Sequence, residues 1–234
     1  MTKQSTIIYT KIIIFIRMRD LMNNYSYQAP QQMSHGSAIR NAWLYFMYYW
    51  VIFAVGTFVG QFVPPGMRMI VSVLIFALVL ISLFVKASRK FGAVISNVMA
   101  FALGVVSYAS FMYYIGTLGP TVFYQNIGLA IGAFLAFGAM GYFVVGDATN
   151  LGRLLFPALI VLVLASFAGI FIQIPMFHLV ITIAGLAIFL LYTIYDFNRM
   201  KRGQFSPREM GFNLFINLLN IIMDILRLAS ILRD

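Results

Sequence analysis

GFNLFINLLNIIMDILRLASIL, residues 211–232, is the last long apolar stretch of the chain. It is long enough to cross a bilayer, because about 20 helical residues span about 30 Å. Its polar residues follow one another at steps of three or four positions, and they are Asn213, Asn217, Asn220, Asp224 and Arg227. At about 100° per residue these positions share one face of a helix. The sequence therefore predicts a membrane helix with a single polar stripe.

The polar stripe is expected to face other helices or a watery cavity rather than lipid. An ionised carboxylate near the bilayer centre costs roughly 2.5–3.5 kcal/mol to insert. Asp224 and Arg227 are spaced to form an i,i+3 ion pair. The three asparagines alone are equally consistent with hydrogen bonds that hold helices together. The added carboxylate and guanidinium favour a polar path or a buried ionic latch.

The composition indicates a polytopic helical membrane protein. Of the 234 residues, 62% are hydrophobic and only 9% are charged, which is too apolar for a water-soluble domain. The chain has no cysteine, which excludes disulfides and thiolate chemistry. The formal net charge of +10 is better explained by basic loops beside a membrane than by a nucleic-acid partner.

Hydropathy predicts an all-α membrane protein with seven spans, at residues 42–63, 67–85, 91–115, 126–146, 151–174, 175–195 and 211–232. Residues 1–38 are expected to form a disordered, basic cytoplasmic tail, and residues 39–234 the transmembrane domain. Met18 and Met22 are alternative start sites, in which case residues 1–17 are not native.

The distribution of basic residues predicts the orientation. With the N-terminus inside, thirteen of the 16 Lys and Arg residues fall in cytoplasmic segments. The positive-inside rule then places the N-terminus in the cytoplasm and the C-terminus, after seven spans, outside.

Small and aromatic residues add expectations about packing. Gly128, Gly132, Gly138 and Gly141 predict close contacts between helices in the fourth span. The aromatic cluster at positions 45–50 is expected at the membrane interface.

Asp196 is the main candidate for chemistry outside the stripe. It ends the sixth span and lies across a short hairpin from Asn213 and Asn217. This arrangement predicts an entrance for a cation or a proton, and it would be pH-sensitive because desolvation favours a neutral carboxylate. A second interpretation stays open, in which Asp196 pairs with Arg199 or Lys201 at the interface.

Two other titratable residues favour structural roles. Asp147 is expected to cap the fifth span, ahead of Ala148, Thr149 and Asn150. His178, near the outer end of the sixth span, is more often packed and hydrogen-bonded than a ligand in such a position.

Enzymatic functions find little support in the sequence. It contains no G-x-S-x-G elbow, H-E-x-x-H pair or P-loop. Asp196 and Asp224 lie at different depths, which argues against an intramembrane aspartyl protease. We expect no catalytic residues and no cofactor.

Several motifs resemble the Bax inhibitor-1 family. They are VGTFVGQFVP (55–64), IGLAIGAFLAFGAMGYFVVGDATNLGRLLFPAL (127–159), LLYTIYDFNRMKRG (190–203) and NLFINLLNIIMDILRLASIL (213–232). The stretch IFIQIPMFHLVIT (170–182) and the chain end SILRD are similar to the bacterial branch typified by the inner-membrane modulator of the FtsH protease.

The resemblance implies a seven-helix bundle whose last helix is central and, for some members, a pH-sensitive calcium leak gated by two aspartates. The first of these matches Asp196, and the second falls on Asn217, so the aspartate pair is broken here. Asp224 lies two turns further along the stripe and could supply the missing carboxylate at another depth. Lys86 falls near a basic residue that neutralises the aspartates in the calcium-leak members.

Two functional hypotheses follow. The first is a cation pathway, with calcium as the transported ion, that enters at Asp196 and Asn217 and passes Asn220 to Asp224, where Arg227 is a plug or counter-ion. Calcium would then contact Asp196 and Asp224 transiently. The second is a regulatory protein that binds a membrane protease such as FtsH through its spans and its cytosolic tail. Both place the chain in the bilayer of a cell inner membrane.

Overall fold

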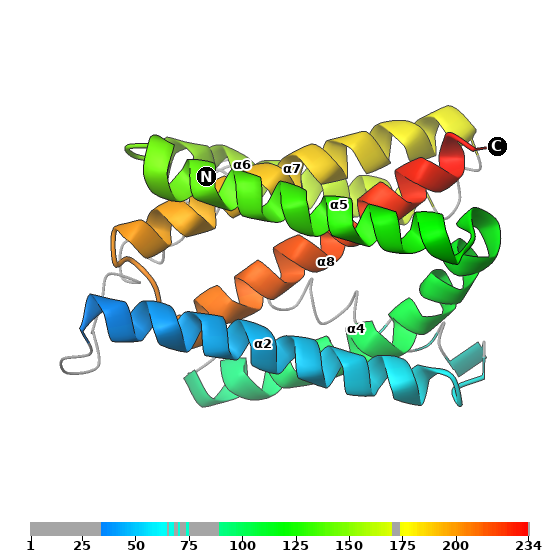
Figure 1. The fold of residues 1–234 in the computed structure, drawn as a ribbon, viewed down its shortest axis with the longest axis horizontal. Helices are drawn as coiled ribbons and strands as arrows, with labels where there is room; N and C mark the ends of the chain where they lie inside the picture. Colours follow the sequence, from blue (N-terminus) through cyan, green and yellow to red (C-terminus); the bar gives the residue numbers. More distant parts are fainter. Residues whose placement is uncertain are drawn as a thin grey trace, which may run out of the picture. The chain divides into compact units, whose positions relative to one another are not determined.

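The computed structural model describes residues 34–64, 66–67, 70, 74, 89–169 and 174–233. Within these ranges the regular structure is entirely helical (Figure 1). The elements are α2 (His35–Gly60), α4 (Arg89–Leu118), α5 (Pro120–Ala139), the π-helix η1 (Met140–Val144), α6 (Thr149–Ala168), α7 (Pro175–Lys201) and α8 (Pro207–Ile231).

Six helices in the described ranges are long and apolar enough to cross a membrane, with η1 continuing α5. This confirms a helical membrane protein with several spans. The second span, expected at 67–85, lies almost wholly outside the described residues, so the seven-helix count stays a prediction.

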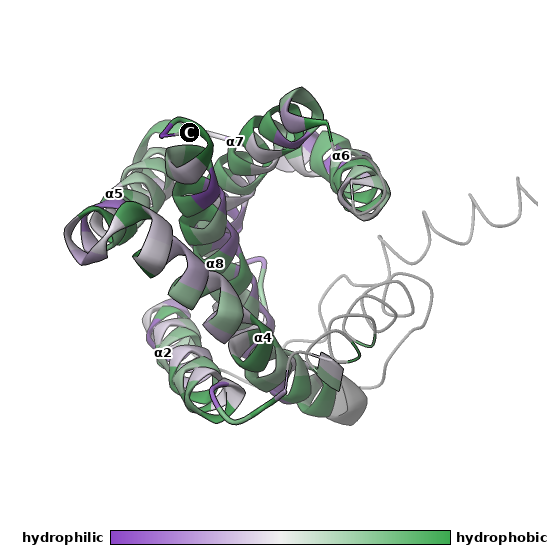
Figure 2. Cartoon of the chain, turned by 90° about the vertical axis from the view of Figure 1, so that its right-hand side faces the viewer, coloured by the Kyte–Doolittle hydropathy of each residue, from purple (hydrophilic) through white to green (hydrophobic). Residues whose placement is uncertain are grey.

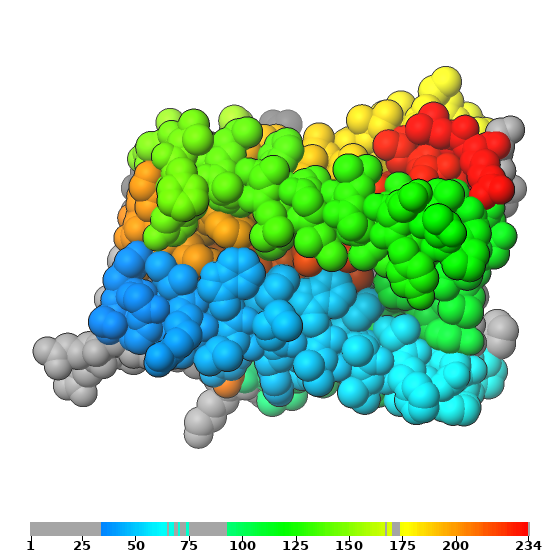
Figure 3. Space-filling model, in the orientation of Figure 1, coloured from blue at the N-terminus to red at the C-terminus, as the bar shows by residue number. Residues whose placement is uncertain are grey.

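Helix α8 occupies the middle of the described bundle. It packs against α2, α4, α5 and α7, whereas α6 packs against α7. Viewed nearly end-on, α8 lies between the other helices, and hydrophilic residues interrupt its apolar surface (Figure 2). From the side, most of it is visible only as a strip between α2 and α5 (Figure 3). The polar stripe is therefore on the helix at the centre of the described bundle.

Glycines bring the helices into close contact along α8 and between α2 and α4. A Cβ at Gly211 would lie 2.6 Å from Tyr45 of α2, and one at Gly185 of α7 would lie 2.8 Å from Asp224 of α8. A Cβ at Gly56 would overlap the carbonyl oxygen of Phe101, and one at Gly104 that of Phe53. Because such contacts exclude a side chain, the glycines set how near the backbones approach.

The predicted glycine contacts of the fourth span are correct in part. Gly138 and Gly141 lie against Phe197 and Ile194 of α7. Gly128 and Gly132 meet no atom within 4 Å in the described part of the chain. These two glycines therefore do not mark a helix contact inside this bundle.

The aromatic cluster of α2 is partly buried inside the bundle. Tyr49 has no exposed surface, and its ring centroid lies 6.2 Å from that of Phe215 on α8. Trp50 and Phe53 complete this ring cluster, at 5.2 and 5.8 Å from Phe215. α8 therefore covers this face of α2, and the expected position of residues 45–50 at the membrane interface stays a prediction.

Several helices are longer than hydropathy predicts. α2 begins at His35, inside the segment expected to be a tail, and α5 begins at Pro120, inside an expected loop. Gly119 has a φ of 80° and Pro120 follows at the first helical position, so one residue separates α4 from α5. α7 continues to Lys201, about two turns past the predicted end, which places Asp196 within a helix.

Candidate functional site

The candidate site lies where the last turns of α7 face the first turns of α8. The carboxylate of Asp196 is only 2% exposed and accepts a hydrogen bond of 2.9 Å from the Asn217 amide, which is 4% exposed. The Asn213 side chain lies beside this carboxylate, about one turn before Asn217 on α8. The structure thus brings together three of the residues that the sequence singled out.

Arg199 connects this buried carboxylate to the surface. Its guanidinium lies 3.6 Å from Asp196, one turn back on α7, and 3.9 Å from Glu209 on α8. Its Nε donates to the Gln204 carbonyl at 3.2 Å, and its charge lies 5.6 Å from the centre of the Tyr195 ring. The interfacial pairing of Asp196 with Arg199 is therefore present, together with the contact to α8 rather than instead of it.

The rest of the stripe is not joined to this cluster. Asn220 donates to the Ile216 carbonyl of its own helix at 2.8 Å. Asp224 lies against Gly185, and Arg227 is exposed. In the described ranges these two form no ion pair within 4.0 Å, so the expected Asp224–Arg227 contact is absent there. Lys86 lies outside the described residues.

Asp196 and Asp224 occupy different levels of the bundle. Gly185, the neighbour of Asp224, precedes Asp196 by three turns of α7, or about 16 Å at 1.5 Å per residue. The two carboxylates therefore cannot hold one ion together. The described residues also contain no cluster of three or more His, Asp or Glu side chains suited to a metal.

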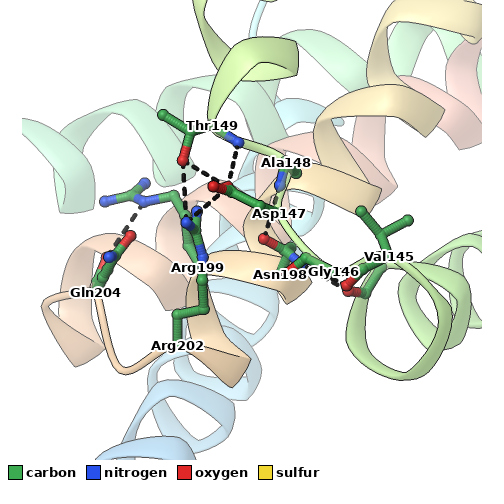
Figure 4. A network of polar contacts seen from close by, with 10 residues as sticks. Val145, Gly146, Asp147, Ala148, Thr149, Asn198, Arg199, Arg202 and Gln204 are labelled. Atoms are coloured by element: carbon green, nitrogen blue, oxygen red, sulfur yellow. Dashed lines mark hydrogen bonds and ion pairs between the residues drawn. The ribbon is translucent and has the colours of Figure 1, made fainter.

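Asn198 is a second buried polar residue of α7, and the sequence analysis assigned it no role. It has no exposed surface, and its amide donates to the carbonyls of Val145 at 2.8 Å and Gly141 at 3.2 Å. Its oxygen accepts from the backbone of Ala148 at 3.0 Å. Asn198 thereby satisfies backbone groups that the end of η1 and the start of α6 leave free (Figure 4).

A surface network adjoins Asn198. Asp147 accepts hydrogen bonds from the backbone and hydroxyl of Thr149 at 2.8 and 2.6 Å, as the predicted cap of α6 requires. Arg202, just past the end of α7, donates to Asp147 at 2.7 Å and to Thr149 at 2.9 Å (Figure 4). The Thr149 hydrogen bonds, and then the charge of Arg202, hold the pKa of Asp147 below its usual range.

His178 is packed among neighbouring groups, as expected, and the hydrogen bonding of its ring stays a prediction. It is half-buried, and its carbonyl accepts a hydrogen bond from Thr182 at 2.8 Å. Its ring lies near Phe177 and Gly169. No described acidic side chain joins it in a metal-binding group.

This geometry allows one kind of chemistry most directly. A buried carboxylate between amide donors and a guanidinium can exchange the guanidinium for a proton or a cation. Asp196 faces the central helix, so that exchange would alter the contact between α7 and α8. The hydrogen bonds of Asn198 and Arg202 hold the same end of α7 to the loop before α6. We call this set of contacts the latch.

Comparisons with known proteins give one consistent result. The family model described as inhibitor of apoptosis-promoting Bax1 matches residues 35–234. A Helicobacter pylori protein is 32% identical over 124 residues, which are 51% of this chain and 53% of that protein. A Golgi anti-apoptotic protein of vaccinia virus is 31% identical over 125 residues, 49% of this chain and 52% of the viral protein.

A membrane protein of Vibrio cholerae is also similar, at 26% identity over 117 residues, with 50% of this chain and 52% of that protein covered. The chain spans about half the length of the curated relatives it matches.

Proposed function

The chain belongs to the Bax inhibitor-1 family of membrane proteins, and from this premise we propose that it is a pH-sensitive cation leak channel with calcium as the transported ion. We place it in a bacterial inner membrane, with the N-terminus in the cytoplasm. The observation that carries the proposal is the buried carboxylate of Asp196 against Asn217 on the central helix.

Asp196 is suited to be the gate of such a path. Its charge is balanced by Arg199 at 3.6 Å and its position is held by Asn217. Protonation would remove the attraction to Arg199, and the guanidinium would then be free to turn toward Glu209 and solvent. Protonation would also remove the charge that attracts the cation, so we propose that flux falls as the pH falls, with a single carboxylate in place of an aspartate pair.

The path beyond the gate would follow the polar stripe of α8. Asn220 and Asp224 lie further along the central helix, and Asp224 is about three turns away from Asp196. A cation would thus pass from one carboxylate to the next rather than bind both at once. Arg227, which is exposed and has no carboxylate within 4.0 Å among the described residues, would be the counter-ion at the far end.

The test is calcium uptake into dye-loaded liposomes that hold the purified full-length protein, between about pH 6 and 8. We expect Asp196→Asn and Asp224→Asn to lower the flux by roughly tenfold, the effect of about 1.4 kcal/mol on a rate or an equilibrium. Asp147→Asn, which removes an exposed carboxylate at the same end of the bundle, is the matched control.

Flux equal to that of protein-free liposomes, or flux unchanged in both Asp196→Asn and Asp224→Asn, would rule out this function. A flux that is the same across the pH range would retain the leak and remove Asp196 as its proton sensor.

A second candidate function is regulation of a membrane protease such as FtsH. The observation that favours it is the set of contacts of Asp196, because a carboxylate held by both Asn217 and Arg199 can join two helices without any ion path. The presence of Asn217 in place of a second aspartate also favours the regulatory function, because it leaves one carboxylate fewer for an ion path.

Co-purification with the protease tests the second function. A chain trimmed to begin at Ser34, just before α2, should keep the bundle folded and lose the partner. If the trimmed chain still co-purifies, the tail is not the binding element.

A further inference from the structure

A pocket of about 390 Å³ lies where the first turn of α8 meets α2 and α4. It does not include Asp196 or any other residue of the polar stripe. The residues that line it combine one cation, two amides, two phenols and one aliphatic side chain: Arg208, Asn41, Asn97, Tyr45, Tyr48 and Leu44.

Arg208 is the charged group of this pocket. It lies 5.2 Å from the centre of the Tyr45 ring, and within the described ranges no carboxylate lies within 4.0 Å of it. The adjacent Glu209 instead faces Arg199. A positive side chain in the first turn of a helix is disfavoured by the helix dipole. The pocket therefore presents a positive charge that the described residues do not neutralise.

The wall of the pocket on α2 is exposed and largely apolar. Leu44 is 61% exposed and Tyr48 is 45% exposed, on a helix apolar enough to span a bilayer. The same end of the bundle carries the start of α2, because His35 lies beside Gly203 in the turn between α7 and α8. Arg208, the second residue of α8, is thus near the membrane surface, with the apolar wall extending inward from it.

From this combination we propose that the pocket binds the phosphate headgroup of an anionic phospholipid. The Arg208 guanidinium matches the geometry of a phosphate, and the amides of Asn41 and Asn97 supply further polar contacts for the headgroup. One acyl chain lies along Leu44 and Tyr48. Free phosphate shares the headgroup chemistry, but it has no apolar part that could contact the exposed wall. The presence of this wall therefore favours a lipid as the ligand.

The experiment is native mass spectrometry of the full-length protein in detergent, titrated with phosphatidylglycerol or with phosphatidylcholine of the same acyl chains. We expect phosphatidylglycerol to bind more tightly, and Arg208→Gln to weaken it roughly tenfold, since a charge-assisted contact is worth about that factor. Arg153→Gln removes an exposed arginine near the start of α6 and is the matched control. Asn97→Leu should weaken phosphatidylglycerol binding to a smaller degree.

Circular dichroism and size-exclusion chromatography establish that each variant is folded. Equal binding of the two lipids, or equal loss in Arg208→Gln and Arg153→Gln, would overturn the proposal. Full competition by inorganic phosphate at the concentration of the lipid would overturn it as well, because the acyl chain would then contribute nothing. None of these results depends on calcium flux.

Discussion

At the scale of single residues, two side chains of α7 that are two positions apart contact different parts of the molecule. Asp196 and Asn198 lie about 200° apart around the helix, so one faces α8 and the other faces η1 and the loop before α6. Both are buried, and each bonds to groups from another segment. The end of α7 is therefore held on two sides, and Arg199 and Arg202 add contacts at its surface.

Asn198→Leu is expected to destabilise the protein. The substitution leaves the Val145 and Gly141 carbonyls and the Ala148 N–H without their partner, at about 1–3 kcal/mol for each buried group. Asn126→Leu is the control, because the Asn126 amide is exposed and bonds only to its own helix at Val122. Thermal unfolding in detergent should show a clear loss for Asn198→Leu and little change for Asn126→Leu; equal losses would contradict the latch.

Asp147 gives the bundle a small acid-dependent contribution to stability. Its pKa is lowered chiefly by the Thr149 hydrogen bonds, and next by Arg202. A lowered pKa in the folded state means that stability is gained above the unfolded pKa of about 3.9 and lost as the pH falls through the folded value.

Asp147→Asn isolates the charge in this contact, because asparagine keeps an oxygen that can accept from Thr149. We expect the variant to unfold at a lower temperature than the wild type between about pH 5 and 7, and the difference to shrink progressively as the pH falls below about 4. A difference of the same size in acid would assign the effect to something other than the charge.

The sequence predicted the Asp196 cluster but missed Asn198. The 3–4 spacing of the stripe and the short hairpin were enough to place Asn213 and Asn217 opposite Asp196. Asn198 bonds to a π-helix and a loop that lie more than 50 residues earlier, and no local pattern encodes that contact. The only feature of the sequence that could have indicated its role was its polar side chain within the last turns of a helix. The hydropathy prediction missed it because it placed the end of that helix before Asn198.

At the scale of helices, the crossing of α2 and α4 depends on reciprocal glycines. Gly56 faces the Phe101 carbonyl and Gly104 faces the Phe53 carbonyl, and Gly60 lies against Val105 one turn on. Since positions 56 and 60 of one helix meet 101 and 105 of the other, α2 and α4 run parallel (Figure 1).

Gly104→Ala is expected to force α2 and α4 apart. The new Cβ would overlap backbone atoms that cannot rotate away, and overpacking of this kind costs about 1–3 kcal/mol. Gly128→Ala is the matched control, because a Cβ added at that position would have no described atom within 4 Å apart from its chain neighbours and the backbone of its own helix. The chain's two tryptophans, Trp43 and Trp50, are both in α2 and contact rings of α7 and α8, so their fluorescence reports a displacement of α2 from its neighbours. Equal melting temperatures for the two variants would refute the crossing.

Helix positions were easier to predict than helix contacts. Apolar runs located the helices, but two G-x-x-x-G patterns of the same form behave differently. The one at 56–60 is a tight crossing, and the one at 128–132 meets nothing in the described bundle. The pattern permits close approach without requiring it, and only the arrangement of neighbouring helices decides which pattern is used.

At the scale of the whole molecule, the parallel arrangement of α2 and α4 bears on the predicted number of membrane spans. α2 ends and α4 begins at opposite ends of the described bundle, which is consistent with the predicted span at residues 67–85 and with an outside C-terminus. This count remains a prediction because most of that segment lies outside the described residues.

Single-cysteine labelling tests the topology. The chain has no cysteine, so each introduced thiol is unique. A membrane-impermeant reagent added outside intact cells should label Arg233→Cys and should fail to label Gly36→Cys and Gln204→Cys. Disruption of the membrane should then expose the latter two. Labelling of Gly36→Cys and Arg233→Cys from the same side would contradict an odd number of spans.

The central position of α8 has a consequence for how the protein is made. The ribosome releases α8 after every described helix that surrounds it. The translocon therefore inserts this polar-striped segment when its neighbours are already in the membrane and can shield its asparagines and aspartate. Until then α2, α4, α5 and α7 share no common partner. Insertion of α8 is thus the step that closes the described bundle, and a nascent chain halted before residue 207 would be a set of inserted helices without a centre.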